Sequence, residues 1–111
     1  LPVCQDCDVY FKKIAVKENL QPNSDTAQTI LDKIRSGNEE DYASAIQSTG
    51  KGDCDVKIEF TLMRCPKCRS ELVTEEFFVK NKDKNFVAVK NLNGKTLLPK
   101  DTIITSLFDK K

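Results

Sequence analysis

Histidine and tryptophan are absent from this sequence of 111 residues, which also has one methionine and only four glycines. The absence of histidine excludes Ser-His-Asp and Cys-His nucleophile pairs, the His-Glu-x-x-His zinc helix, and zinc fingers that mix cysteine with histidine. Long apolar runs are missing too, and none approaches the ~20 residues of a membrane-spanning helix. The sequence therefore predicts neither the common hydrolytic sites nor a membrane span.

A strong excess of either charge is also missing. Eighteen basic residues face seventeen acidic ones, so the net charge of +1 gives no sign of a strongly basic nucleic-acid binder. The balance changes along the chain: residues 1–53 hold six basic and nine acidic side chains (−3), and residues 54–111 hold twelve and eight (+4). With no glycine-rich phosphate loop and no paired carboxylates for acid–base work, we expect a non-enzymatic protein that binds another protein.

Helices are predicted in the first part of the chain, residues 1–53. One covers residues 4–14, where apolar side chains recur at helical spacing: Cys4, Cys7, Phe11 and Ile14. A second begins at Asp25, with Gln28 in the capping-box position, and ends at Gly37. A third begins at Asn38, which precedes three acidic residues that favour a helix N-terminus.

An antiparallel meander is predicted for residues 54–111. From Cys54 to Met63 apolar and polar side chains alternate, with the even positions facing the core. Further strands are expected over 72–79, 86–89, 96–98 and 103–108, with a tight turn at Asn93-Gly94. We therefore predict a single α+β domain, residues 1–111, with N-terminal helices followed by an antiparallel β-meander. This order of elements resembles cystatin-like folds, although the Gln-x-Val-x-Gly inhibitory loop of that family has no match.

Four of the five cysteines form two Cys-x-x-Cys pairs, Cys4 with Cys7 and Cys65 with Cys68. Four thiolates in two such pairs can close a tetrahedral site, and the pairs resemble the knuckles of zinc ribbons. This resemblance implies a zinc-binding interaction or nucleic-acid module inside the cell. It is the alternative interpretation of the sequence.

Three observations favour disulfides over zinc. Residues 8–64 separate the two pairs, which is 57 residues where compact zinc sites have ~15–20. Asp8 and Arg69 stand where ribbon knuckles favour glycine. The first pair also lies on the predicted helix. The preferred prediction is therefore a protein held together by disulfides, with no metal or other cofactor.

The disulfide candidates are all five cysteines. On a straight strand Cys54 and Cys65 would lie about 35 Å apart, too far for a bond. We expect Cys4 and Cys7 to pair with two of Cys54, Cys65 and Cys68, and the odd cysteine to permit a disulfide-linked homodimer. The start without methionine is consistent with a removed signal peptide, so we expect a secreted binding protein such as an inhibitor, effector or toxin-like ligand.

Two smaller hypotheses remain. Cys65 and Cys68 can be an active dithiol, because a strand, this motif and a following helix would resemble the thioredoxin-like unit. Phe77 and Phe78 are adjacent, so one of them points away from the core of a sheet. We therefore nominate Phe78 and three lysines near it as a binding patch: Lys80, Lys82 and Lys84.

Overall fold

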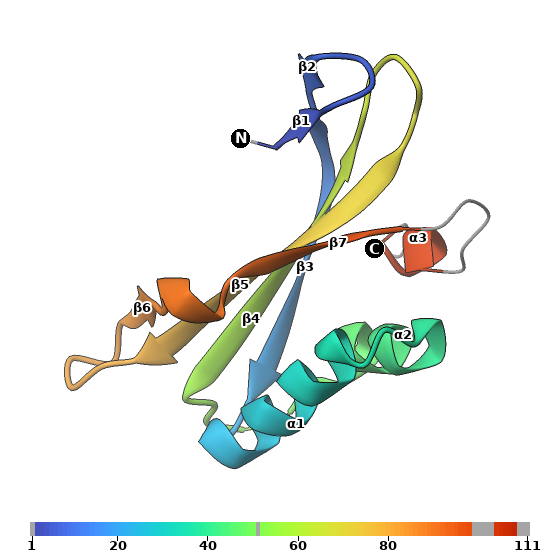
Figure 1. Ribbon diagram of the computed structural model, residues 1–111. Coiled ribbons are helices and arrows are strands. Elements are labelled where there is room, and N and C mark those ends of the chain that lie inside the picture. Colours follow the sequence, from blue (N-terminus) through green and yellow to red (C-terminus); the bar gives the residue numbers. More distant parts are fainter. Residues whose placement is uncertain (1, 51, 99–103, 109–111) are drawn as a thin grey trace.

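The computed structural model of the protein describes residues 2–50, 52–98 and 104–108. Its elements follow in the order β1 (Val3–Cys4), β2 (Val9–Tyr10), β3 (Lys12–Gln21), α1 (Ser24–Arg35), α2 (Glu39–Gln47), β4 (Val56–Arg64), β5 (Glu71–Lys80), β6 (Phe86–Ala88), the 3₁₀ turn η1 (Lys90–Leu92), β7 (Gly94–Leu97) and α3 (Ile104–Leu107). Figure 1 shows a long twisted sheet, with α1 and α2 beside its lower half and the β1–β2 hairpin at its upper end.

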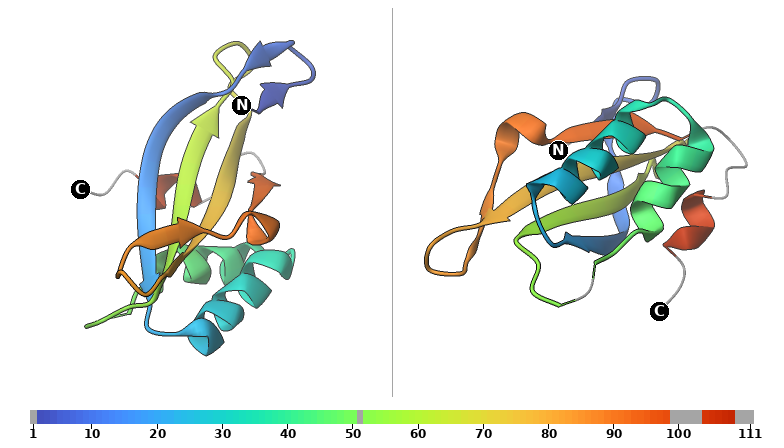
Figure 2. Two further views of the ribbon diagram at one scale, coloured as in Figure 1. Left: turned by 90° about the vertical axis from the view of Figure 1, so that its left-hand side faces the viewer. Right: turned by 90° about the horizontal axis from the view of Figure 1, so that it is seen from below.

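A five-stranded antiparallel sheet forms the centre of the molecule. Its strand order is β3-β4-β5-β6, and β7 also pairs with β5. Because β6 pairs with the last residues of β5 and β7 with the first, both cover the same edge of β5. The opposite edge is β3, which Figure 2 shows running along one side of the sheet.

The main core lies between the sheet and the two longer helices. Even-numbered side chains of β4 face α1 and α2 and are buried: Val56, Ile58, Phe60 and Leu62. Ile58, Phe60 and Leu62 belong to one core cluster with buried apolar residues of the helices, including Ile30, Leu31, Ile34 and Ile46. The predicted alternation in this strand is confirmed. The expected strands over 72–79 and 86–89 are confirmed as β5 and β6.

Both longer helices form where their apolar spacing predicted them. The capping box of α1 differs from the expected one: the side chain of Asn23, rather than Asp25, accepts the N–H of Thr26. Gly37 follows α1 with φ +77°, a conformation that costs glycine little. Asn38 caps α2 as predicted, by accepting the N–H of Asp41. No helix in the described part of the chain is long and apolar enough to cross a membrane.

The predicted fold class is wrong in its order of elements. Residues 4–14 do not form a helix but the hairpin β1–β2 and the start of β3, so strands rather than helices begin the fold and the cystatin-like order fails. The helical spacing of the four apolar residues does not reflect a helix. Cys4 lies in β1 and Phe11 lies between β2 and β3, and both are buried in a second, smaller core. Residues 104–107 form α3 instead of a strand, and Gly94 begins β7 instead of closing a tight turn.

Candidate metal centre

The β1–β2 hairpin and the turn between β4 and β5 lie together at the upper end of the sheet (Figure 1), and the four cysteines of the two Cys-x-x-Cys pairs, which these turns carry, form one cluster. Cys4 ends β1 and Cys7 lies in the turn before β2, whereas Cys65 and Cys68 lie in the turn between β4 and β5. All four sulfur atoms lie within 4.8 Å of one another. Antiparallel pairing of β3 with β4 brings the two pairs together across the long gap in sequence.

The spacing of the sulfur atoms fits metal coordination and not a disulfide. The Sγ atoms of Cys4 and Cys68 are 3.6 Å apart, whereas a disulfide bond requires about 2.05 Å. Metal–thiolate bonds of ~2.3 Å in a tetrahedron place neighbouring sulfurs about 3.8 Å apart. All five cysteines are free thiols, so the predicted disulfide framework is wrong. The four clustered cysteines can hold a metal ion.

The turn around Cys65 has the backbone of a metal-binding knuckle. The N–H groups of Lys67 and Cys68 both point at the Cys65 sulfur, with N···S distances of 3.4 Å. The N–H of Arg69 donates to the Cys65 carbonyl at 3.0 Å, and Arg69 has φ +65°. These N–H groups stabilise negative charge on the sulfur, as a thiolate ligand requires.

The turn around Cys4 repeats this arrangement. The N–H of Asp8 donates to the Cys4 carbonyl at 2.7 Å, and Asp8 has φ +55°. Backbone N–H groups of Cys7 and Asp6 point at the Cys4 sulfur. The missing glycines, which counted against a metal site, therefore do not prevent either knuckle: Asp8 and Arg69 adopt the left-handed conformation themselves.

Replacing the left-handed residues by glycine should stabilise the site. A non-glycine residue in this region pays a steric cost of ~1–2 kcal/mol, which glycine avoids at some cost in unfolded-state entropy. We expect Asp8→Gly and Arg69→Gly each to raise the unfolding free energy of the metal-loaded protein by about 0.5–1 kcal/mol. Urea denaturation measures this change in unfolding free energy, with Asp6→Gly as the control. Asp6 has no positive φ and should lose stability; equal effects at Asp6 and Asp8 would contradict the argument.

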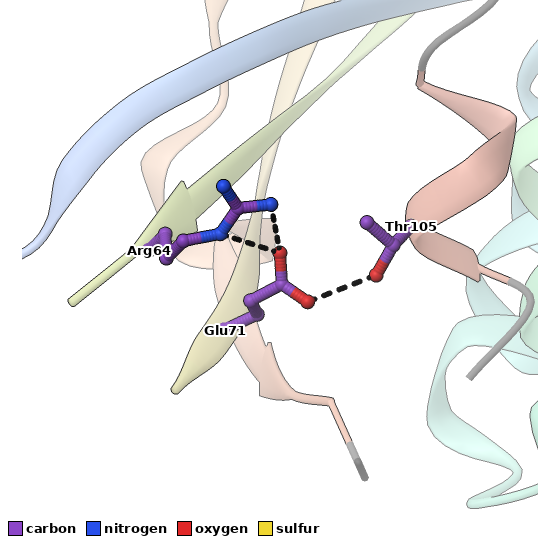
Figure 3. A network of polar contacts seen from close by, with 3 residues as sticks. All are labelled: Arg64, Glu71 and Thr105. Carbon is purple, nitrogen blue, oxygen red and sulfur yellow. Dashed lines mark hydrogen bonds and ion pairs between the residues drawn. The ribbon is translucent and has the colours of Figure 1, made fainter. Parts of the chain in front are cut away.

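A polar network fixes the base of the second knuckle (Figure 3). Arg64 and Glu71 are directly opposite at the ends of β4 and β5. Nε and Nη2 of Arg64 donate to one carboxylate oxygen of Glu71 at 3.0 and 2.8 Å. The hydroxyl of Thr105 in α3 donates to the other oxygen at 3.0 Å. The ion pair links β4 and β5 at the base of the hairpin that carries Cys65 and Cys68. The hydrogen bond from Thr105 attaches α3 to the same carboxylate.

A small apolar core, separate from the main one, includes two of the four cysteines. Phe11, Met63 and Leu72 are buried there with Cys4 and Cys65, apart from the main core. Cys65 is fully buried, whereas Cys68 lies at the surface. We call residues 2–13 and 63–72 the tip; its interior consists of this cluster and the four sulfurs.

The four thiols differ in how readily they ionise. Hydrogen bonds from the Ser70 hydroxyl and N–H lower the pKa of Cys68 to about 6. Burial opposes the ionisation of Cys65, but the N–H groups directed at its sulfur outweigh it and lower its pKa. The pKa of Cys7 rises to about 12 because of its hydrogen bond with Cys68, and burial raises the pKa of Cys4. Without a metal, negative charge is thus favoured in the second knuckle.

The fifth cysteine lies outside this cluster. Cys54 is buried just before β4, and the nine residues of that strand separate it from Cys65 at the other end. The dithiol hypothesis loses its structural premise, because residues 71–80 after Cys68 form strand β5 and not a helix.

The two Cys-x-x-Cys pairs in the sequence already indicated the four candidate ligands. Their supports, Ser70 and the Arg64–Glu71 pair, gave no comparable signal.

The nominated binding patch lies at the opposite end of the sheet. Phe78 is half-buried on β5, with the Lys57 ammonium 4.7 Å from its ring centre. Lys80, Lys82 and Lys84 line a shallow pocket in which Asp53 and Asp55 also take part. The structure thus brings the three lysines together, next to acidic side chains and far from the cysteines.

Comparison with protein-family models, curated proteins and solved structures found no match for this chain.

Proposed function

We propose that Cys4, Cys7, Cys65 and Cys68 bind one zinc ion, and that the protein is a non-enzymatic interaction module whose tip is held in shape by this metal. The observation that supports the proposal best is the meeting of four sulfur atoms within 4.8 Å on two knuckles of matching backbone geometry.

Zinc suits this set of ligands better than other common metals. Four thiolates without histidine or carboxylate are typical of structural zinc sites, which are tetrahedral and closed. Calcium and magnesium select oxygen ligands, and none of the four residues offers one from its side chain. Four protein ligands leave no position for water or substrate, so the proposed role is structural and not catalytic.

The build of the tip explains why a metal would be needed there. β1 and β2 are only two residues long, and the tip buries just five side chains of its own. Such a small core cannot offset the conformational entropy of ordering two turns. Zinc–thiolate sites also require reduced cysteines, so we place the function in a reducing compartment, as in the intracellular alternative.

The ligand set can be tested by exchanging single cysteines. We expect wild type to bind one zinc or cobalt(II) ion per chain and Cys65→Ser to lose tight binding, because a hydroxyl replaces a thiolate ligand. Cys54→Ser is the matched control and should keep full stoichiometry. Metal analysis measures the stoichiometry, and thiolate-to-cobalt absorption reports the ligands. Equal loss in both variants, or no metal bound by wild type, would contradict the proposal.

A further inference from the structure

The outer edge of β3 is the longest unpaired backbone edge in the described part of the chain. β3 pairs with β4 on one side only. At its C-terminal end the other side is covered, because Gly50 N–H donates to the Leu20 carbonyl at 2.6 Å and the Thr49 hydroxyl accepts from Leu20 N–H. For residues 12–18 the described structure shows no backbone partner on this side. Seven consecutive residues therefore present an open edge.

Apolar side chains are concentrated along this edge. Seven large apolar residues of the described structure are exposed, and four of them lie on the tip and the first half of β3: Val3, Tyr10, Ile14 and Val16. Tyr10 is 61% exposed, Ile14 44% and Val16 42%. Two β-branched residues and a tyrosine beside an open edge are side chains that pair well across strands.

The charge of the same segment is positive. Residues 12–18 contain Lys12, Lys13 and Lys17, and the single acid, Glu18, already forms an ion pair with Lys57 at 3.4 Å. The half-buried Lys17 ammonium donates to the Leu107 carbonyl of α3 at 3.4 Å, so the free positive charge of the edge is that of Lys12 and Lys13. Lys12 and Lys13 are exposed and form no ion pair with any residue of the described structure. Directly opposite Lys12 is Arg64, whose own partner is Glu71. An incoming strand thus meets a positive edge.

We propose that an extended, acidic segment of a partner protein adds to the sheet as a strand along residues 12–18 of β3. Backbone hydrogen bonds to the open edge would supply affinity, as in other strand additions. Ile14 and Val16 would contact apolar side chains of the segment. Lys12 lies opposite Arg64 and Lys13 opposite Met63, so the two lysines point to opposite faces of the sheet. Carboxylates on the other face of the segment would pair with Lys12, and Lys13 would add to the positive potential of the edge. This surface extends the proposed interaction function and does not depend on which metal binds.

The charges favour this occupant over a second copy of the chain. Pairing β3 with another β3 would bring two lysine-rich segments together, and lysine on an edge strand opposes such pairing. A nucleic acid is also less suited, because it would use neither the open N–H groups nor the β-branched side chains. Beside the edge the described structure exposes a single aromatic ring, that of Tyr10, whereas Phe78 and Phe86 lie at the far end of the sheet beside Lys57, so successive bases would have no stacking platform along residues 12–18.

The test uses the zinc-loaded chain of 111 residues, labelled with ¹⁵N, and a seven-residue probe peptide, Glu-Val-Glu-Val-Glu-Val-Glu, blocked at both ends. We expect amide shifts confined to residues 12–18 and their neighbours, with slowed hydrogen exchange there. The same peptide with alternate N-methylated amides should not bind, because it lacks half of its donors. A Lys-Val peptide of equal length should bind at least tenfold more weakly.

Charge reversal on the edge provides the matched variant. Lys12→Glu with Lys13→Glu should weaken the Glu-Val peptide about tenfold. Lys82→Glu with Lys84→Glu makes the same change in net charge at the far end and should leave the affinity within about twofold. Equal loss in both double variants would show a non-specific charge effect and overturn the proposal.

Other outcomes overturn it as clearly. Shifts at Phe78 and Phe86, tighter binding of a thymidine decanucleotide at residues 12–18, or peptide-free dimerisation through β3 would each identify a different surface or occupant. Zinc content is measured in every sample. A chain that binds the peptide but takes up no zinc when zinc is supplied would refute the proposed metal function and leave the edge intact, whereas full zinc occupancy without peptide binding would refute the edge alone.

Discussion

Removing the proposed zinc ion with a chelator is expected to unfold the tip and leave the rest of the fold in place. The turns of residues 2–13 and 63–72 should lose their structure, because four thiols replace a closed metal site and only five side chains are buried there. Apparent free energies of structural zinc binding are about 10–16 kcal/mol, so this is the largest single effect expected for the protein.

The main core should survive because it has no cysteine ligand in it. Phe60, Phe77 and Ile46 are almost fully buried between the sheet and helices α1 and α2. Their packing does not involve the metal-binding turns. Local unfolding of the tip is therefore separable from global unfolding.

Amide hydrogen exchange with and without chelator measures this separation. Tip amides should exchange freely without metal and regain protection when zinc is restored, while amides of α1 and the middle of β4 stay protected in both states. Cys54→Ser is the control and should behave as wild type. Complete unfolding on chelation, or unchanged protection in the tip, would contradict the prediction.

The second large effect is expected at the buried carboxyl of Glu75. Its side chain is 3% exposed on the core face of β5, and the hydroxyl of Tyr42 in α2 donates to it at 2.6 Å. Burial raises the pKa of Glu75 above its ordinary value of 4.5, although hydrogen bonds from Tyr42 and Thr96 partly oppose this shift. No cation forms an ion pair with Glu75 among the described residues.

This raised pKa gives the protein a defined pH dependence. The native state holds the proton of Glu75 more tightly than the unfolded state does. The stabilisation is complete below the unfolded pKa, near 4.5, and is lost as the pH rises through the higher folded pKa. Glu75→Gln keeps an acceptor for Tyr42 and cannot ionise. We therefore expect this variant to be more stable than wild type at neutral pH, by an amount that shrinks towards pH 4.5.

Urea denaturation of both proteins across this pH range, at saturating zinc, gives the difference in unfolding free energy. Taking the difference between variant and wild type cancels the pH dependence of zinc binding itself. Tyr42→Phe should destabilise wild type by about 1–3 kcal/mol, because it leaves the buried carboxyl without its donor. A pH-independent difference, or a less stable Glu75→Gln protein at neutral pH, would refute the assigned ionisation.

Local patterns predicted the two longer helices and the strands after residue 54. Ala27, Ile30, Leu31 and Ile34 follow a helical period and cover one face, so the sequence indicated both the helix and its buried side. The alternation from Val56 to Leu62 likewise indicated a strand and its core face. In these segments local preference and tertiary packing agree.

The prediction for the beginning of the chain was wrong because local pattern and tertiary packing disagree there. Cys4, Cys7, Phe11 and Ile14 are spaced like one face of a helix, yet Ile14 is exposed at a β-bulge and the others belong to the tip. The pairing partner of β3 is β4, and the paired residues are between 35 (Gln21 with Val56) and 52 (Lys12 with Arg64) positions apart, so no local period reports such a partner.

By itself the sequence determined which residues can bind a metal. Because it has two Cys-x-x-Cys pairs and no histidine, a zinc site of the zinc-finger type would have to consist of four cysteines. It could not decide between disulfides and metal, because that choice depends on distances between sulfur atoms that are far apart in the chain. The tertiary structure excludes the disulfides and brings the four thiols within 4.8 Å of one another, because β3 pairs with β4 and because Asp8 and Arg69 adopt the left-handed conformation in the two turns.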